Sequence, residues 1–165
     1  NTGEYIKSLA GQGKCHGSSW SRGQSWGLYG FGLSYRYTKD EKYLDAARKI
    51  GEYVLKNIPE DGLIPTDFYQ EEDIDWKDSC AAAILANGYL ELYEHTEEKK
   101  YYQTAIKLIE TLIDNSFSLD EDIDYLLTDC SASYDEKEHN YSIIYADFFL
   151  VEALLRLAGK ENFIW

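Results

Sequence analysis

The sequence predicts an all-α fold, and three observations support that prediction. The chain has 165 residues and a formal net charge of −14, with 44% hydrophobic residues, 28% charged residues and two prolines. This composition is typical of one ordinary globular domain rather than of a disordered or fibrous chain. Five segments then show helical periodicity, and one sequence pattern recurs along the chain. We therefore expect residues 1–165 to belong to a single domain built from repeated helical hairpins.

Three of the predicted helices have the composition of buried helices. The first covers about residues 20–37 and is rich in glycine and aromatic residues. The second covers about residues 77–94 and is apolar on nearly all sides, because residues 81–86 are alanine, isoleucine and leucine. The third covers about residues 142–157 and is also of the buried type. A helix without a polar face packs against other elements on most sides.

The other two predicted helices alternate with these and are amphipathic. They cover about residues 41–57 and 98–114, and their apolar residues are spaced three and four apart. That spacing places one apolar stripe against a core and leaves the opposite face to solvent.

The alternation is an internal repeat. Residues 37–43 align with residues 95–101, and residues 36–44 align with residues 156–164. Each unit is a buried helix, a tight turn, an amphipathic helix and a long return loop. An open solenoid would leave one helix face wet in every repeat, whereas residues 81–86 offer no polar face. We therefore expect a closed ring of hairpins, of which this chain forms about half.

The long return loops, at about residues 58–76 and 115–141, mark the functional end of this arrangement. Long loops carry function more often than short turns do. The three buried helices all begin at the long-loop end, so their free backbone N–H groups lie there as well.

Residues 12–27, which lead into the first buried helix, hold the richest set of candidate site residues. Arg22 and Trp26 are four residues apart and therefore share one helix face. A guanidinium beside an indole suits an acidic sugar, since the first can bind a carboxylate and the second can stack on a pyranose ring. The competing interpretation is core packing with a buried ion pair. Ser18 or Ser19 is expected to cap the helix.

Several acidic residues have simpler explanations. Asp78 and Ser79 open the second buried helix, where capping explains both. Asp147 lies inside the third buried helix, so we expect it to pair with an arginine of a buried helix or to face a wet cavity. Residues 71–73 and 120–122 are most simply solvated surface, and neither segment has the glycine of a calcium loop.

Cysteine and histidine positions argue against a metal centre. The three cysteines, Cys15, Cys80 and Cys130, lie far apart in the sequence, and His16, His95 and His139 have no metal-like spacing. They match no metal-binding spacing, and the sequence has no nucleophile elbow or phosphate loop, so we expect no metal and no cofactor. Free thiols favour a reducing compartment, and we expect a bacterial cytoplasmic protein.

The charge and hydropathy patterns also exclude two classes of partner. An acidic chain with scattered basic residues repels nucleic acid, and no apolar run approaches the roughly 18 to 20 residues of a membrane span. The sequence begins Asn1-Thr2-Gly3 and contains no methionine, so we expect a processed or excised piece of a longer protein.

Three segments carry a resemblance to a known family. Residues 20–31, residues 78–79 with the alanine-rich run 81–86, and residues 145–154 resemble the C-terminal half of the unsaturated glucuronyl hydrolases of glycoside hydrolase family 88. The related rhamnogalacturonyl hydrolases usually have Asn-Gly where this chain has Gln-Ser at residues 24–25. The resemblance covers nearly the whole chain.

This resemblance implies an (α/α)6 barrel with its pocket at the N-terminal ends of the inner helices. The positions that correspond to substrate-contacting residues of the family are Gln12, Arg22 and Trp26. The loop before the last inner helix, which in the family helps to select the sugar and its sulfation, corresponds here to a segment with Ser131, Ser133 and Tyr134 that extends to Lys137.

The resemblance also implies an activity. In the family, an aspartate protonates C4 of a 4,5-unsaturated uronic acid and activates water for attack at C5, and the hemiketal then opens and releases the next sugar. Both catalytic aspartates fall upstream of Asn1, so we expect the parent protein to be the enzyme and this chain to lack them. The expected substrates are unsaturated oligosaccharides left by lyases acting on glycosaminoglycans.

Two alternative functions stay open. The chain is alternatively part of a rhamnogalacturonyl hydrolase, or a non-catalytic helical module that binds a glycan or a protein.

Half a ring leaves apolar surface uncovered on its first and last inner helices. We expect the uncovered surface to include Leu28, Phe31, Phe149 and Leu150. We therefore expect the isolated chain to self-associate.

Overall fold

The computed structural model describes residues 6–7 and 11–160, and the helices in this part of the chain agree with the predicted ones to within two residues. They are α1 (Ser21–Thr38), α2 (Glu41–Asn57), α3 (Ser79–Thr96), α4 (Lys99–Asn115) and α5 (Ile144–Leu157). Outside the helices, the described backbone pairs through isolated bridges. The last residues of the third sequence repeat, 161–164, lie outside the described residues.

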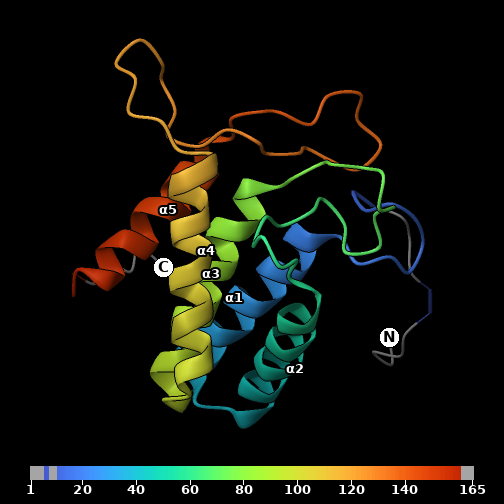
Figure 1. Ribbon diagram of the computed structural model, residues 1–165. Helices are drawn as coiled ribbons and strands as arrows, with labels where there is room; N and C mark the ends of the chain where they lie inside the picture. Colours follow the sequence, from blue (N-terminus) through green and yellow to red (C-terminus); the bar gives the residue numbers. More distant parts are fainter. Residues whose placement is uncertain (1–5, 8–10, 161–165) are drawn as a thin grey trace.

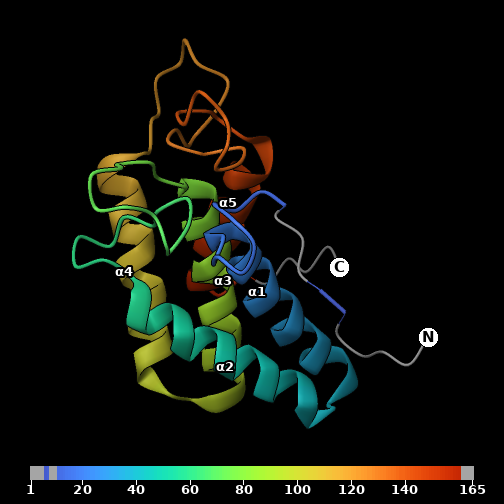
Figure 2. The same cartoon turned by 90° about the vertical axis from the view of Figure 1, so that its right-hand side faces the viewer.

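The helices form two layers. Helices α1, α3 and α5 lie side by side in an inner layer and begin at the same end, while α2 and α4 lie outside them (Figures 1 and 2). Helix α3 packs against α1, α4 and α5, and α2 packs mainly against α1. The chain therefore forms about half of an (α/α)6 barrel, as predicted, with α1 and α5 on either side of α3.

The core is centred on α3. Every residue from Ser79 to Leu92 is buried, which explains why this segment has no polar face. Helix α1 approaches α3 closely at Gly88, where a Cβ atom would lie 2.7 Å from Cγ of Leu28 and 3.2 Å from the backbone nitrogen of Tyr29. Glycine is the residue that permits this approach.

The short turns repeat in structure as they do in sequence. Lys39 is the C-cap residue after α1 and Glu97 is the C-cap residue after α3, and both adopt the left-handed conformation, with φ of 55° and 57°. The two residues occupy equivalent positions of the repeat. Both hairpins therefore reverse direction through a left-handed residue directly after the inner helix.

Charged residues join the inner helices at the end opposite the long loops. The carboxylate of Glu91 is fully buried in α3 and accepts hydrogen bonds from Arg36 of α1 at 2.6 and 2.8 Å and from Arg156 of α5 at 2.9 Å. Glu94 contacts the same two arginines. His95 Nε2 lies 2.9 Å from the Glu91 carboxylate.

The prediction of the uncovered flank was wrong for three of its four residues. Leu28 and Leu150 are fully buried and Phe149 is 4% exposed, and only Phe31 is substantially exposed. Leu28 packs against α3 at Gly88, and the ring of Phe149 packs against Trp26 and Tyr29 of α1. The large exposed apolar side chains on α1 and α5 and at their ends are Trp26, Phe31, Tyr37, Ile144, Tyr145, Val151 and Leu154. Among the described residues, no helix combines the length and apolar character needed to cross a bilayer.

Candidate functional site

Three loop segments meet over the N-terminal ends of the inner helices (Figure 1). They are residues 11–20, 58–78 and 116–143, and backbone hydrogen bonds join them to the helices and to one another. The amide of Ser21 donates to the carbonyl of Thr66 at 3.1 Å, and the amide of Tyr134 donates to the carbonyl of Gln12 at 2.8 Å. The long-loop end is therefore an ordered surface in which the three loops are hydrogen-bonded to one another and to the helices.

Arg22 lies almost completely buried at this end. Its Nε donates to Oδ2 of Asp78 at 2.9 Å, and its Nη2 makes an ion-pair contact of 2.9 Å with the same oxygen. Its Nη1 donates to the hydroxyl oxygen of Tyr145 at 2.8 Å. Burial raises the pKa of Asp78, and the guanidinium opposes that shift. Asp78 also caps α3, accepting the amide of Ala81 at 3.3 Å, so capping and ion pairing occur together.

Trp26 borders an apolar cavity between α1 and α5. The cavity has a volume of about 490 Å³ and is lined by Trp26, Tyr29, Gly30, Leu33, Tyr145, Phe148 and Phe149. The indole is 38% exposed, and its ring centroid lies 6.0 Å from that of Tyr145 and 5.2 Å from that of Phe149. Arg22 does not line the cavity but donates to the hydroxyl of Tyr145, which does. Arg22 and Trp26, four residues apart, therefore both contact Tyr145.

Gln12 joins the first loop to the last. Its Nε2 donates to the carbonyl of Ala132 at 3.0 Å, in addition to the backbone bond with Tyr134. Positions 12 and 132–134 are therefore brought together in the fold. A hollow of about 350 Å³ lies beside Gln12 and is lined by Gly11, Gln12, Gly13, Cys15, Gly17, Ser18 and Trp20.

Lys14, Glu71 and Tyr134 form a loop clasp. Nζ of Lys14 lies 2.5 Å from the Glu71 carboxylate, and the Tyr134 hydroxyl donates to the same carboxylate at 2.8 Å. Lys14, and then the Tyr134 hydroxyl, lower the pKa of Glu71 to about 2. Burial and the Glu71 charge raise the pKa of Tyr134 to about 12. The Tyr134 ring packs edge-on against Trp76, with 5.0 Å between centroids.

Ser131 and Ser133 differ in their surroundings. The hydroxyl of Ser131 is fully buried, accepts from Oγ1 of Thr66 at 2.8 Å and donates to the carbonyl of Lys77 at 2.8 Å. Nδ1 of His139 lies 3.1 Å away, and the imidazole stacks on Trp76 at 3.8 Å. Ser133 is partly exposed in the same loop. Ser131 thus joins two loops.

Sequence reasoning missed Asp67, which organises the first loop. Its buried carboxylate accepts from the amides of Lys14 and Ser19, both at 3.1 Å, from Oγ of Ser18 at 2.7 Å and from the amide of Tyr69 at 2.9 Å. The expected serine cap of α1 was wrong, because the N-cap is Trp20 and Ser18 donates to Asp67 instead. A single loop aspartate has no spacing signal that would identify it.

The predicted arginine partner of Asp147 was also wrong. Its Oδ1 accepts the backbone amide of Leu127 at 2.9 Å, and the residue borders a hollow of about 240 Å³ under residues 118–126. Asp147 is 8% exposed. The Arg22 guanidinium pairs with Asp78 instead, and the loop backbone holds the carboxylate of Asp147 at the edge of the hollow.

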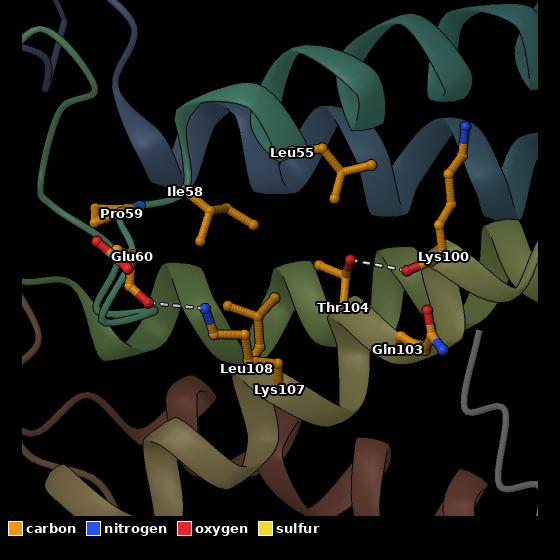
Figure 3. Close-up of a pocket in the computed structure, with 9 residues that line it drawn as sticks. All are labelled: Leu55, Ile58, Pro59, Glu60, Lys100, Gln103, Thr104, Lys107 and Leu108. Atoms are coloured by element: carbon orange, nitrogen blue, oxygen red, sulfur yellow. Dashed lines mark hydrogen bonds between the residues drawn. The ribbon is translucent and has the colours of Figure 1, made fainter.

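Another hollow lies away from this end, between the outer helices α2 and α4 (Figure 3). It has a volume of about 370 Å³, and Lys100 and Lys107 lie on its rim. Nζ of Lys107 donates to the carbonyl of Glu60 at 2.9 Å, and Nζ of Lys100 lies 2.6 Å from Glu52. Both amino groups are thus already engaged, and no predicted site residue lies here.

The described residues contain no cluster of three or more His, Cys, Asp or Glu side chains that could hold a metal ion. Cys80 and Cys130 are buried free thiols. Burial raises the pKa of Cys130 to about 11 and raises that of Cys80 further, so both are protonated at neutral pH and are poor nucleophiles.

Comparison with known proteins finds similarity to glycoside hydrolases. Residues 31–157 match the model of glycosyl hydrolase family 76. An unsaturated glucuronyl hydrolase of Formosa agariphila is 33% identical over 93% of this chain and 39% of its own length. The crystal structure of an unsaturated glucuronyl hydrolase of Bacillus sp. GL1, responsible for the degradation of glycosaminoglycan, superposes with a TM-score of 0.86 at 32% identity, over 94% of this chain and 43% of that one.

A third relative was solved with a sugar bound. It is a mutant unsaturated glucuronyl hydrolase of Streptococcus agalactiae in complex with dGlcA-GalNAc6S, with a TM-score of 0.83 and 29% identity over 99% of this chain and 46% of that one. The present chain spans less than half the length of each of these three proteins.

Proposed function

Because residues 31–157 match its model, the chain belongs to glycosyl hydrolase family 76, and we propose that it is part of a hydrolase of unsaturated uronyl oligosaccharides. The names of its relatives support that activity. The family model that matches is that of family 76, whereas the sequence motifs resemble the unsaturated glucuronyl hydrolases of family 88. We therefore propose the closer relationship to family 88. We also propose that residues 1–165 form the C-terminal half of one barrel domain.

One observation carries the proposal. Trp26 and Tyr145 border an apolar cavity at the end where the inner helices begin, and Arg22 holds the Tyr145 hydroxyl from behind. Aromatic walls of this kind bind the apolar face of a pyranose ring. Arg22 acts as a positioning residue here, because its charge is already paired with Asp78.

The proposed reaction is hydration of the C4=C5 double bond of the terminal uronic acid. A carboxylic acid gives its proton to C4, water adds its oxygen to C5 and returns a proton to the carboxylate, and the hemiketal opens to release the next sugar. Three buried acids at or near this end are engaged within the chain: Asp78 with Arg22, Asp67 with four donors, and Glu152 with the Tyr29 hydroxyl at 2.8 Å. These engagements support a catalytic acid from outside the 165 residues.

The test uses the full-length protein and an unsaturated disaccharide. Turnover removes the ultraviolet absorbance of the conjugated enol ether and produces one free sugar per bond. We expect Trp26→Ala to lower kcat/KM and Trp26→Phe to retain most of it, with Tyr102→Ala, a similarly exposed aromatic residue on the outer helix α4, as the control. Turnover of unsaturated rhamnogalacturonyl substrates alone would favour the related enzyme class, and binding without turnover would favour a non-catalytic module.

A further inference from the structure

Asp67 is a fully buried carboxylate that holds the first loop from below. Its Oδ1 accepts the amides of Ser19 and Tyr69, and its Oδ2 accepts the amide of Lys14 and the hydroxyl of Ser18. All four donors are uncharged groups, three of them backbone amides. Burying a carboxylate is costly unless hydrogen bonds of this kind compensate it. The side chain therefore spends its hydrogen-bonding capacity on the backbone course of one loop.

The Oδ2 atom closes residues 14–18 into a turn. Its two donors, Lys14 and Ser18, stand at the two ends of this segment. The Ser18 hydroxyl in turn accepts the amide of Cys15 at 3.2 Å, and the Ser18 amide donates to the Cys15 carbonyl at 3.2 Å. The turn thus depends on one oxygen of Asp67.

Gly13 shows how closely the loop backbone approaches the carboxylate. A Cβ atom at Gly13 would lie 2.9 Å from Oδ2 of Asp67 and 2.9 Å from Oγ of Ser18. The residue before it, Gln12, crosses to the last loop and donates to the carbonyl of Ala132 at 3.0 Å. Residues 11–18 also provide most of the lining of the hollow of about 350 Å³ at this end. The position of Asp67 therefore fixes both the crossing and the hollow.

The same aspartate is linked to the wall of the apolar cavity. Asp67 and Trp20 form an antiparallel bridge, and the guanidinium carbon of Arg22 lies 5.4 Å from the centroid of the Trp20 ring. Arg22 then donates to the hydroxyl of Tyr145, which lines the cavity. The hollow and the cavity thus adjoin a chain of contacts that begins at one buried carboxylate.

We propose that Asp67 is a positioning residue for substrate binding, an inference that rests on the proposed function. Asp67 is too deeply buried to touch a sugar, and it acts by ordering residues 11–19 before the substrate arrives. A loop that is already ordered costs less binding free energy than one that must be ordered on binding. The proposed catalytic acid lies outside the chain, so the loop should affect the substrate and the transition state equally. Such an interaction appears in KM and not in kcat.

The main test is Asp67→Asn in the full-length protein, with an unsaturated uronyl disaccharide as substrate. Asparagine keeps the shape but retains one acceptor oxygen, so its NH₂ group faces two donors. We expect KM to rise by about tenfold and kcat per folded molecule to change by less than about twofold. Asp73→Asn is the matched control, because it removes an exposed carboxylate of the same loop segment and should change neither constant.

Two further variants reach the same contact from its other side. Gly13→Ala pushes the loop backbone away from Asp67 and leaves the carboxylate intact, so KM should rise as in Asp67→Asn. Ser18→Ala removes one of the four donors and should raise KM by a smaller factor. These variants decide the matter if Asp67→Asn does not fold.

The exposed thiol of Cys15 gives a direct measurement of loop order. A fluorophore attached to Cys15 reports the motion of residues 14–18 through its anisotropy, with labelled Cys15→Ser protein as the blank. We expect lower anisotropy in Asp67→Asn and Gly13→Ala than in the wild type. Asp73→Asn should match the wild type.

The outcomes separate this inference from the proposed function. Wild-type turnover with unchanged KM in the folded variants overturns the positioning role and leaves the proposed function standing. A fall in kcat at constant KM also overturns it, because a merely structural residue would reduce the amount of active enzyme. Absence of turnover by the wild-type protein overturns the proposed function, and the role of Asp67 in substrate binding with it.

Discussion

The guanidinium of Arg22 and the carboxylate of Asp78 form an ion pair that is almost wholly removed from solvent, with the two side chains 2% and 0% exposed. The pair joins α1 to the first residue before α3, and its free edge holds Tyr145 of α5. One arginine therefore sets the relative positions of three inner helices at the candidate site. Its alignment with a substrate-contacting position of the resembled family is consistent with a positioning role through Tyr145.

Replacing Arg22 should destabilise the protein strongly. Arg22→Met leaves the Asp78 charge buried without a partner, a change that costs about 3 to 5 kcal/mol in other proteins. Adding Asp78→Asn should recover part of that loss, because the uncompensated charge is then removed. Urea unfolding of the full-length protein measures both variants. Arg48→Met is the control, since Arg48 contacts Glu98 at 3.7 Å on the surface, and we expect a change below about 1 kcal/mol.

The buried carboxylate of Glu91 should matter more than its neighbour Glu94. Glu91→Gln leaves Arg36 and Arg156 facing a neutral amide in a fully buried position, and we expect a loss of about 2 to 4 kcal/mol. Glu94 contacts the same arginines with a side chain that is 33% exposed, so Glu94→Gln should cost less than about 1 kcal/mol. Equal losses for the two variants in denaturant unfolding would contradict this ranking.

Close helix packing gives a matched pair of glycine variants. Gly88→Ala places a Cβ atom against Leu28 and the Tyr29 backbone, and we expect it to cost about 1 to 3 kcal/mol. Gly30→Ala adds a methyl group where no atom lies within 4 Å, on the side of the apolar cavity, and should gain about 0.5 to 1 kcal/mol from helix propensity. Thermal unfolding would show the opposite signs, and a stabilising Gly88→Ala would mean that α1 and α3 are not in close contact.

The helices were predictable from the sequence, whereas the loop contacts were not. Periodicity and the internal repeat set α1 to α5 to within two residues, because each helix is specified by its own local pattern. The i, i+4 spacing of Arg22 and Trp26 indicated a shared face, but the partner of Arg22 lies 56 positions away and leaves no local signal. Asp67 and the loop clasp depend likewise on segments that meet only after the hairpins pack.

The loop clasp of Lys14, Glu71 and Tyr134 should respond to acid. Lys14 and Tyr134 lower the pKa of Glu71 from 4.5 to about 2, so the clasp's stabilising contribution is fully present above pH 4.5 and is lost as the pH falls towards 2. Fluorescence of Trp76, which contacts Tyr134, should report the loss. Tyr134→Phe removes one donor and should move the transition to higher pH. Tyr125→Phe, in the same loop segment, should leave it in place.

The isolated 165-residue chain should self-associate or form a molten species. Its α5 carries exposed apolar residues, among them Val151 and Leu154, which are 41% and 38% exposed, and each 100 Å² of such surface covered is worth about 2.5 kcal/mol of transfer free energy. Val151→Asp/Leu154→Asp should therefore reduce association in sedimentation at micromolar concentration. Ile113→Asp changes an equally exposed residue of the outer helix α4 and should have little effect. A sharply melting monomer that binds no hydrophobic dye would show that this face needs no cover.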